Sequence, residues 1–379
     1  MLSSNYELVK NWLVSSDIIV SESKNPNYGG VRSFYDEKKE QFAFMYPEIT
    51  GYFSSTMRFL FEHEQNKKFV EFSEISCNWL IRLYENYGGI IQGITTDGIP
   101  VKLVYSFDTG VCVKGLLDCY RLTNNSYYLE YAKKMSQWIL NETISEDGQI
   151  KALKNLETDT FETDPSIWYK QYGCLHLKLA IPLLQMYVIT RDETYLTQTK
   201  KICDKICDFQ LSDGSILLHI GKQTVNLHTL CYALEGLLYA YNITKNQKYL
   251  SSVQKAVEWC QKRIKNDGSI DLWFNSKYHS KSSYPIAQLI RIKLLLSKLE
   301  NQDMESIIFQ LKSFLVSLQA KNNNKKINGG FYEEFSKTVF GWKKTLRINS
   351  WSSMFALQAL YWIDNYKNLE FSKEIELLY

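Results

Sequence analysis

The chain has 379 residues, of which 45% are hydrophobic and 14% aromatic, so it can bury a sizeable core and is not a disordered protein. Its 44 basic and 41 acidic side chains leave a formal charge of only +3, which argues against a nucleic-acid-binding surface. We find neither a signal-peptide pattern at the N-terminus nor an apolar run of 18 residues. We therefore expect a cytoplasmic protein without a membrane span.

Two repeated segments organise the chain. A glycine turn followed by a β-favouring residue recurs at intervals of 54 to 66 residues, counted between first glycines. These first glycines are Gly29, Gly88, Gly148, Gly214, Gly268 and Gly329. A polar segment of the type TNNSYYL occurs at 123–129 and again at 190–196 and 244–250, where it indicates a short turn between two helices. Each repeat has room for two helices of 15 to 20 residues.

Hydrophobic periodicity predicts twelve helices in chain order. We expect them at about 5–16, 46–64, 67–84, 106–123, 126–142, 171–190, 192–211, 226–243, 247–264, 282–299, 303–320 and 348–364. Helices that follow the glycine turns are apolar on nearly all sides, whereas their partners keep a polar face. This alternation predicts an all-α (α/α)6 toroid, with six helical hairpins arranged as an inner and an outer ring. We expect residues 1–379 to form one such domain, since an open solenoid would need polar capping repeats.

The long connections from outer to inner helices should gather on one face, where the N-termini of the inner helices converge. Carboxylate and imidazole groups near these N-termini are the candidate catalytic residues: Glu48, Asp108, His228 and Glu235. The two carboxylates in first turns could instead cap their helices. His228 could be a core histidine, and Glu235 lies inside an apolar helix, where it needs a partner.

Aromatic, cationic and amide side chains, the types that usually bind sugars, occur at the same helix starts. The candidate substrate-binding residues are Tyr46, Tyr52, Trp168, Lys170, Tyr172, His176, Tyr232, Tyr284, Arg347, Asn349 and Trp351. For several of these a structural role is the alternative. Tyr52 and Trp351 could be core residues, and Arg347 and Asn349 could join the last repeat to the first.

Other chemistries find little support in the sequence. Cys203 and Cys207 share a helix face, but no second pair at metal-ligand spacing accompanies them, so we interpret the eight cysteines as free thiols. The sequence lacks the nucleotide-binding, zinc-protease and α/β-hydrolase motifs. We expect no metal and no cofactor, and a glycan or sugar as the partner.

The inner-helix segments YPEITGYF, FDTG, HTLCYALEGLL and INSWSSMFALQAL resemble those of six-hairpin glycosidase-like toroids over essentially the whole chain. This group includes unsaturated glucuronyl hydrolases, sugar 2-epimerases and the helical domain of D-glucuronyl C5-epimerases. The resemblance to the hydrolases implies acidic residues near inner-helix starts, for which Asp108 is the matching candidate. The resemblance to the 2-epimerases implies paired histidines, for which only His176 and His228 are available.

Three functions remain open at this point. The first is a glycoside hydrolase acting on an acidic, uronic-acid-containing glycan, with Asp108, Glu48 and Glu235 as the carboxyl groups and Arg347 holding the substrate carboxylate. The second is a uronyl epimerase or polysaccharide lyase, in which His228 or a tyrosine abstracts the proton α to the carboxylate. The third is a toroid that binds glycans without catalysis.

Overall fold

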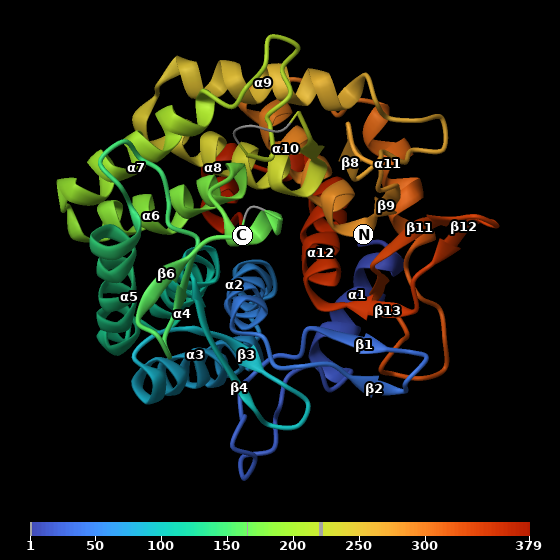
Figure 1. Ribbon diagram of the computed structural model, residues 1–379. Helices are drawn as coiled ribbons and strands as arrows, with labels where there is room; N and C mark the ends of the chain where they lie inside the picture. Colours follow the sequence, from blue (N-terminus) through green and yellow to red (C-terminus); the bar gives the residue numbers. More distant parts are fainter. Residues whose placement is uncertain (1, 165, 220–222) are drawn as a thin grey trace.

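A ring of six inner helices surrounds the centre of the protein in this computed structural model, which describes residues 2–164, 166–219 and 223–379 (Figure 1). The inner helices are α2 (Pro47–Glu64), α4 (Ser106–Thr123), α6 (Ala180–Thr190), α8 (Leu227–Thr244), α10 (Ser283–Leu299) and α12 (Ser350–Asp364). Each packs against the next, and α12 packs against α2, so the ring is closed. The structure therefore confirms the predicted (α/α)6 toroid.

The outer helices cover the inner ring. They are α1 (Ser4–Ser15), α3 (Lys67–Tyr87), α5 (Ser126–Trp138, followed by the π turn η1, Ile139–Thr143), α7 (Glu193–Cys207), α9 (Gln247–Gln261) and α11 (Ile307–Ser317). Their starts follow from the repeated polar turns. In the first of these turns Asn124 adopts a left-handed conformation (φ 55°) that ends α4, and the Asn125 side chain caps α5 by accepting from the backbone N–H of Tyr127 at 3.0 Å.

The third inner helix begins later than predicted. Residues 174–179 form the 3₁₀ turn η3 (Cys174–Leu179), and regular α-helix starts at Ala180. Pro182 accounts for this start, because its ring has no N–H and is tolerated only in the first turn of an α-helix. A second short 3₁₀ turn, η2 (Trp168–Lys170), lies upstream.

Short strands, which we did not predict, fill the connections from outer to inner helices. They are β1 (Phe34–Asp36), β2 (Gln41–Phe42), β3 (Ile91–Ile94), β4 (Pro100–Tyr105), β5 (Leu153–Asn155), β6 (Thr160–Glu162), β7 (Val225–Asn226), β8 (Trp273–Phe274), β9 (Ser280–Ser282), β10 (Phe331–Tyr332), β11 (Glu334–Thr338), β12 (Gly341–Lys344) and β13 (Arg347–Asn349). They form four antiparallel sheets, ordered β10-β13-β1-β2, β12-β11-β9, β3-β4-β5-β6 and β7-β8.

These sheets join neighbouring repeats at one end of the ring. The pairing of β1 with β13 is the closing contact, because it brings Tyr35 of the first repeat opposite Ile348 of the last. The last glycine turn also joins the last repeat to the first. Gly329 has a φ of +95° and its Cα lies against the backbone carbonyl of Leu8 in α1, so any side chain there would collide with the first outer helix.

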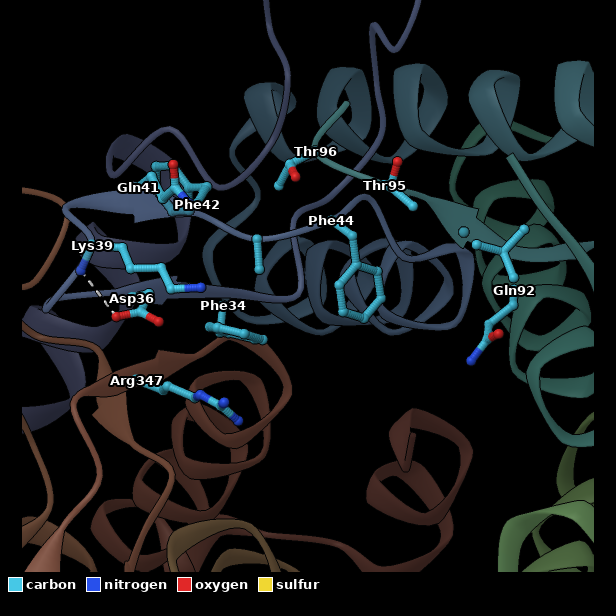
Figure 2. A pocket seen from close by; sticks show the side chains of 13 residues that line it. Phe34, Asp36, Lys39, Gln41, Phe42, Phe44, Gln92, Thr95, Thr96 and Arg347 are labelled. Atoms are coloured by element: carbon cyan, nitrogen blue, oxygen red, sulfur yellow. Dashed lines mark hydrogen bonds between the residues drawn. The ribbon is translucent and has the colours of Figure 1, made fainter. Parts of the chain in front are cut away.

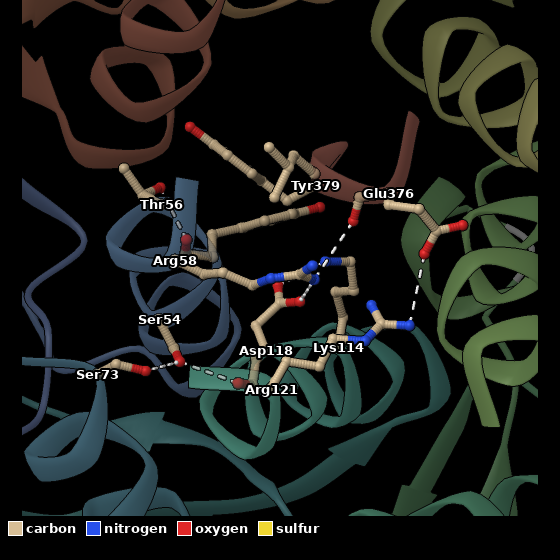
Figure 3. Close-up of polar contacts among 12 residues, drawn as sticks. Ser54, Thr56, Arg58, Ser73, Lys114, Asp118, Arg121, Glu376 and Tyr379 are labelled. Carbon is tan, nitrogen blue, oxygen red and sulfur yellow. Dashed lines mark hydrogen bonds and ion pairs between the residues drawn. The ribbon is translucent and has the colours of Figure 1, made fainter. Parts of the chain in front are cut away.

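The C-terminal segment occupies the centre of the ring (Figure 1). After α12 the chain forms η4 (Tyr366–Asn368), α13 (Phe371–Glu374) and η5 (Ile375–Leu377). The fully buried Tyr379 donates its hydroxyl to the Met354 carbonyl at 2.8 Å, and its own carbonyl accepts from Arg291 at 2.9 Å. Figure 3 shows Arg58 and Arg121 reaching the same segment at Glu376, at 3.4 Å each. The tail thus seals the end of the ring opposite the strands.

Candidate active site

The strands lead directly into the N-termini of inner helices, so these N-termini open at the strand-bearing end of the ring (Figure 1). A cavity of about 280 Å³ lies at this end. Its lining comprises Tyr46, Glu48, Ile49, Gln92, Tyr105, Phe107, Asp108, Trp168, Tyr169, Leu175, His176, His228, Tyr232, Tyr284 and Trp351. Nine of the fifteen candidate site residues are in this lining, and we refer to the hollow as the central cavity.

Two carboxyl groups face the central cavity from adjacent inner helices. Glu48 is in the first turn of α2 and Asp108 in the first turn of α4, and their side chains are buried, with 8% and 4% exposure. Burial raises the pKa of Glu48 to about 7, against the opposing effects of a hydrogen bond from Tyr46 and the positive charge of Lys178. Burial and the nearby Glu48 raise the pKa of Asp108 well above its usual range.

Asp108 has a free oxygen as well as a raised pKa. Its Oδ2 atom is buried and has no hydrogen-bond partner. A buried oxygen of this kind costs free energy unless a ligand or a proton satisfies it. The N-cap residues of α2 and α4, Tyr46 and Tyr105, make no side-chain capping hydrogen bond, whereas the Asp108 carboxylate accepts from its own backbone N–H in the first turn of α4. The site therefore has two buried carboxyl groups with raised pKa values in unequal environments.

Both candidate histidines line the central cavity in the neutral form. Burial lowers the pKa of His228 to about 3 and that of His176 to about 4. His228 Nδ1 lies 2.5 Å from the Oε1 atom of Gln288, so with a proton on Nδ1 its Nε2 atom is free to accept one. The ring of His228 packs against Tyr232 and Tyr284, with centroids 4.2 and 4.5 Å away.

The structure does not bring Glu235 to the central cavity, contrary to its place among the catalytic candidates. Its side chain is fully buried, with Oε1 2.6 Å from Arg291 and Oε2 2.6 Å from Lys178. Gln288 also donates to it at 3.3 Å. Both oxygens are occupied by cations below the cavity, so Glu235 is a partner of Gln288, which in turn holds His228.

Five predicted substrate-binding residues also lie outside the central cavity. Tyr52 is beneath it, 1% exposed, and donates its hydroxyl to that of Tyr232 at 3.0 Å. Tyr172 stacks behind His176, with centroids 5.9 Å apart, and Lys170 ends the turn η2. Asn349 caps α12 by accepting from the N–H of Ser352 at 2.9 Å. Arg347 is exposed on β13 and lines a groove beside the cavity.

Several lining residues were not among the candidates. Tyr105, Phe107 and Tyr169 stand within the same helix starts, and selecting every aromatic residue there would have included them. Gln92 gave no such signal, because it belongs to the short strand β3, where its neighbour Ile91 is buried and Gln92 is partly exposed. Within the described ranges, no three His, Cys, Asp or Glu side chains come together in a way that could hold a metal ion.

Comparison with known proteins places the fold among carbohydrate-related structures and one sequence family. A family model for glycosyl hydrolase family 76 matches residues 54–233, somewhat less than half of the chain. Similar solved structures include cellobiose 2-epimerase from Bacillus thermoamylovorans B4167 (TM-score 0.75, 14% identity, 93% of this chain and 98% of that one). An unsaturated glucuronyl hydrolase specific for heparin (0.70, 12%, 97% and 98%) and a D-mannose isomerase (0.75, 10%, 96% and 97%) are also similar. No curated protein matches the sequence.

The chain therefore has the same fold as these proteins, the (α/α)6 toroid of six helical hairpins that its inner-helix segments indicated. The family match supports a carbohydrate-processing enzyme. The described helices include none that is both long and apolar enough to cross a lipid bilayer.

Proposed function

We propose that the protein is a glycoside hydrolase that acts on an acidic glycan, with Asp108 as general acid and Glu48 as general base. The observation that carries this proposal is the pair of buried carboxyl groups at the starts of α2 and α4, one of which has an unpartnered oxygen. Glycoside hydrolysis needs two carboxyl groups in opposite protonation states, and unequal environments are the usual means of obtaining them.

The environments assign the two roles. Asp108 is assigned as the group that holds the proton, because burial and Glu48 both raise its pKa. It therefore donates that proton to the glycosidic oxygen as the bond to the anomeric carbon breaks. Glu48 is assigned as the group that ionises first, since Lys178 favours its charged form, whereas Tyr46 favours the charged form of both groups. Ionised Glu48 then takes a proton from the water that adds to the anomeric carbon, after which the pair exchanges protons with solvent.

The remaining lining suits a sugar ring. Trp168, Tyr284 and Trp351 provide aromatic faces for the C–H-rich side of a pyranose. Gln92 and the neutral His176 and His228 supply hydrogen-bonding groups for its hydroxyls. All eight cysteines lie in the described ranges and are free, seven of them buried, which is consistent with the cytoplasmic location that we propose.

A second candidate function rests on His228. Its neutral imidazole, held through Nδ1, leaves Nε2 as a possible base in the central cavity. Such a base could abstract the proton α to a uronate carboxylate, which would make the protein a uronyl epimerase or lyase. Hydrolysis remains the better supported function, because no lysine or arginine stands in the described cavity lining to neutralise the carboxylate of a reacting uronate.

Proton NMR in D2O with a panel of uronic-acid-containing oligosaccharides separates these functions. Hydrolysis gives new anomeric signals and no deuterium on carbon. Epimerisation removes the H5 signal, and elimination produces a vinyl proton. The Asp108→Asn and His228→Asn variants provide the matched comparison: hydrolysis requires that the first lose more activity than the second. The reverse ranking, or exchange at H5, would contradict the proposal.

A further inference from the structure

Two more hollows continue the central cavity across the strand-bearing face. The first, of about 380 Å³, shares Gln92 with the central cavity and is lined by residues of β1, β2 and β3 and by Arg347 of β13 (Figure 2). The second, of about 330 Å³, shares Gln41, Phe42, Phe44 and neighbouring residues with the first. The first hollow therefore adjoins the central cavity at Gln92, and the second shares a wall with the first. We call the two outer hollows the lateral groove.

Cations and aromatic rings line the lateral groove together. The guanidinium of Arg347 lies 4.9 Å from the ring centre of Phe34, and that of Arg32 lies 5.1 Å from the ring centre of Phe42. Lys39 is exposed beside them, and Figure 2 shows Phe44 between Phe34 and Gln92. Aromatic faces bind the C–H side of sugar rings, and arginine binds carboxylates through paired N–H groups.

One acidic side chain shares the lateral groove with these three cations. The Oδ1 atom of Asp36 accepts from the backbone N–H groups of Lys38 and Lys39, at 3.0 and 3.1 Å. Its charge is therefore partly satisfied by the β1–β2 turn. Arg347 also lies 3.7 Å from Glu333, and Arg32 donates to the backbone carbonyl of Asp17. Three cations thus stand against two acidic side chains, Asp36 and Glu333, and the groove keeps a small excess of positive charge.

The central cavity has the opposite character. Its acidic groups are Glu48 and Asp108, and its described lining includes no lysine or arginine. A carboxylate on the reacting sugar would approach ionised Glu48, whose charge is offset in part by Lys178, a lysine already paired with Glu235 at 2.6 Å below the cavity. The same carboxylate on a neighbouring sugar would meet Arg347 or Lys39 instead.

We propose that the lateral groove binds the sugars next to the reacting one and holds their carboxylates on Arg347, Lys39 and Arg32. The substrate is then an acidic oligosaccharide or polysaccharide in which a neutral sugar occupies the central cavity and acidic sugars flank it. This inference rests on the proposed function, because it assigns the sugars around the bond that Asp108 and Glu48 cleave. The sequence predicts that Arg347 binds the carboxylate of the reacting sugar. In the present proposal Arg347 instead binds the carboxylate of a neighbouring sugar in the lateral groove.

Binding measured without turnover tests the groove separately from the chemistry. The full chain carrying Asp108→Asn is applied to an array of acidic oligosaccharides of two to eight sugars, each printed beside its carboxyl-reduced neutral counterpart. A second protein adds Arg347→Gln and Lys39→Gln to Asp108→Asn. A control adds Lys200→Gln and Lys367→Gln, which remove two exposed lysines outside the groove.

We expect the parent to prefer acidic oligosaccharides to their reduced counterparts, and to prefer three or more sugars to two. The Arg347→Gln/Lys39→Gln protein should lose about tenfold in affinity for the acidic members, as expected for charge-assisted contacts, and little for the neutral ones. The control should match the parent. Equal binding of acidic and reduced glycans, or unchanged affinity of the Arg347→Gln/Lys39→Gln protein for the acidic members, would contradict the proposed role of the lateral groove. Groove-dependent binding without hydrolysis by the wild-type chain would instead overturn the proposed function.

Discussion

The two ends of helix α4 carry the same residue type in opposite states. Asp108 at the N-terminal end and Asp118 near the C-terminal end are both buried, with 4% and 1% exposure. Asp118 is paired with Arg58 at 2.7 Å and with Lys114 at 2.5 Å (Figure 3), and these cations lower its pKa to about 2. Asp108 has an unpartnered oxygen and a pKa raised well above its usual range.

This difference shows how the ring separates stability from chemistry. Toward the closed end, the buried Asp118 is matched by Arg58 of a neighbouring helix and Lys114 of its own helix, so its charge is fixed over the physiological pH range. At the open end, the described cavity lining has no lysine or arginine, and Lys178, which acts on Glu48 from below, is paired with Glu235, so the protons of Glu48 and Asp108 remain available. One helix thus supplies a structural aspartate and a candidate catalytic aspartate about 15 Å apart, from the helical rise over ten residues.

Replacing Asp108 should have the largest effect on activity. Asp108→Asn removes the proton donor, and we expect kcat to fall by about 10²–10⁴, the usual contribution of a general acid. The free energy of unfolding should stay the same or rise, because an unpartnered buried carboxyl group is removed. Steady-state kinetics with the glycan substrate measure the change in kcat, and urea unfolding measures the change in stability. A large loss of stability would mean that Asp108 is structural.

Replacing Asp118 should have the converse effect. Asp118→Ala leaves Arg58 and Lys114 buried without their counter-ion, and we expect a loss of about 3–5 kcal/mol in the free energy of unfolding. Its lowered pKa gives the pH dependence. The stability that Asp118 contributes is present above its unfolded-state pKa of 3.8 and is lost as the pH falls toward about 2. Urea titrations at pH 7 and pH 3 should therefore show a smaller difference between wild type and variant at the lower pH.

The activity should follow pH as a bell-shaped curve. Below pH 7 the rate should fall about tenfold per unit, because Glu48, with a pKa of about 7, becomes protonated. At high pH the rate should fall again as Asp108 loses its proton. Tyr46→Phe removes a hydrogen bond that favours both ionised carboxylates, so both limbs of kcat/KM should move to higher pH. If the two apparent pKa values of the kcat/KM profile were unchanged in Tyr46→Phe, the proposed effect of Tyr46 on the carboxyl groups would be contradicted.

We expect the smallest effects on activity and stability at Tyr52, which lies beneath the central cavity, between the environments of Asp108 and Asp118. Tyr52→Phe removes the hydrogen bond to the Tyr232 hydroxyl, and we expect a loss of about 0.5–1.5 kcal/mol in stability. Because Tyr52 does not line the central cavity, kcat should change by less than about threefold, well under the loss of one transition-state contact. A larger fall in kcat with an unchanged free energy of unfolding would mean that Tyr52 takes part in substrate binding or catalysis.

The fold could be predicted almost completely from the sequence, because its repeat is expressed locally. A left-handed residue such as Asn124 and a capping residue such as Asn125 mark each short turn, and the inner helices are apolar on all sides. The strands escaped prediction since most have two to four residues, too few for alternation to be recognised. Their pairing also joins distant segments, as in the contact of Tyr35 with Ile348.

The site could be predicted only in part, for a related reason. Position at a helix start identified Glu48 and Asp108, since all inner helices begin at one end of the ring. Glu235 was misplaced because its partners Lys178 and Arg291 come from other repeats, 57 and 56 residues away. Nothing in the local sequence indicates that these cations occupy both of its oxygens.

The buried C-terminal tail has a consequence for the order of events during turnover. With Tyr379 and η5 packed into the ring, the central cavity is a dead end, and every molecule must enter and leave through the strand-bearing mouth. A fragment in the lateral groove lies nearer that mouth than the sugar in the cavity. After cleavage the fragment held only by the groove should therefore depart first and the fragment that contains the cavity sugar last, so that the second fragment should compete with fresh substrate.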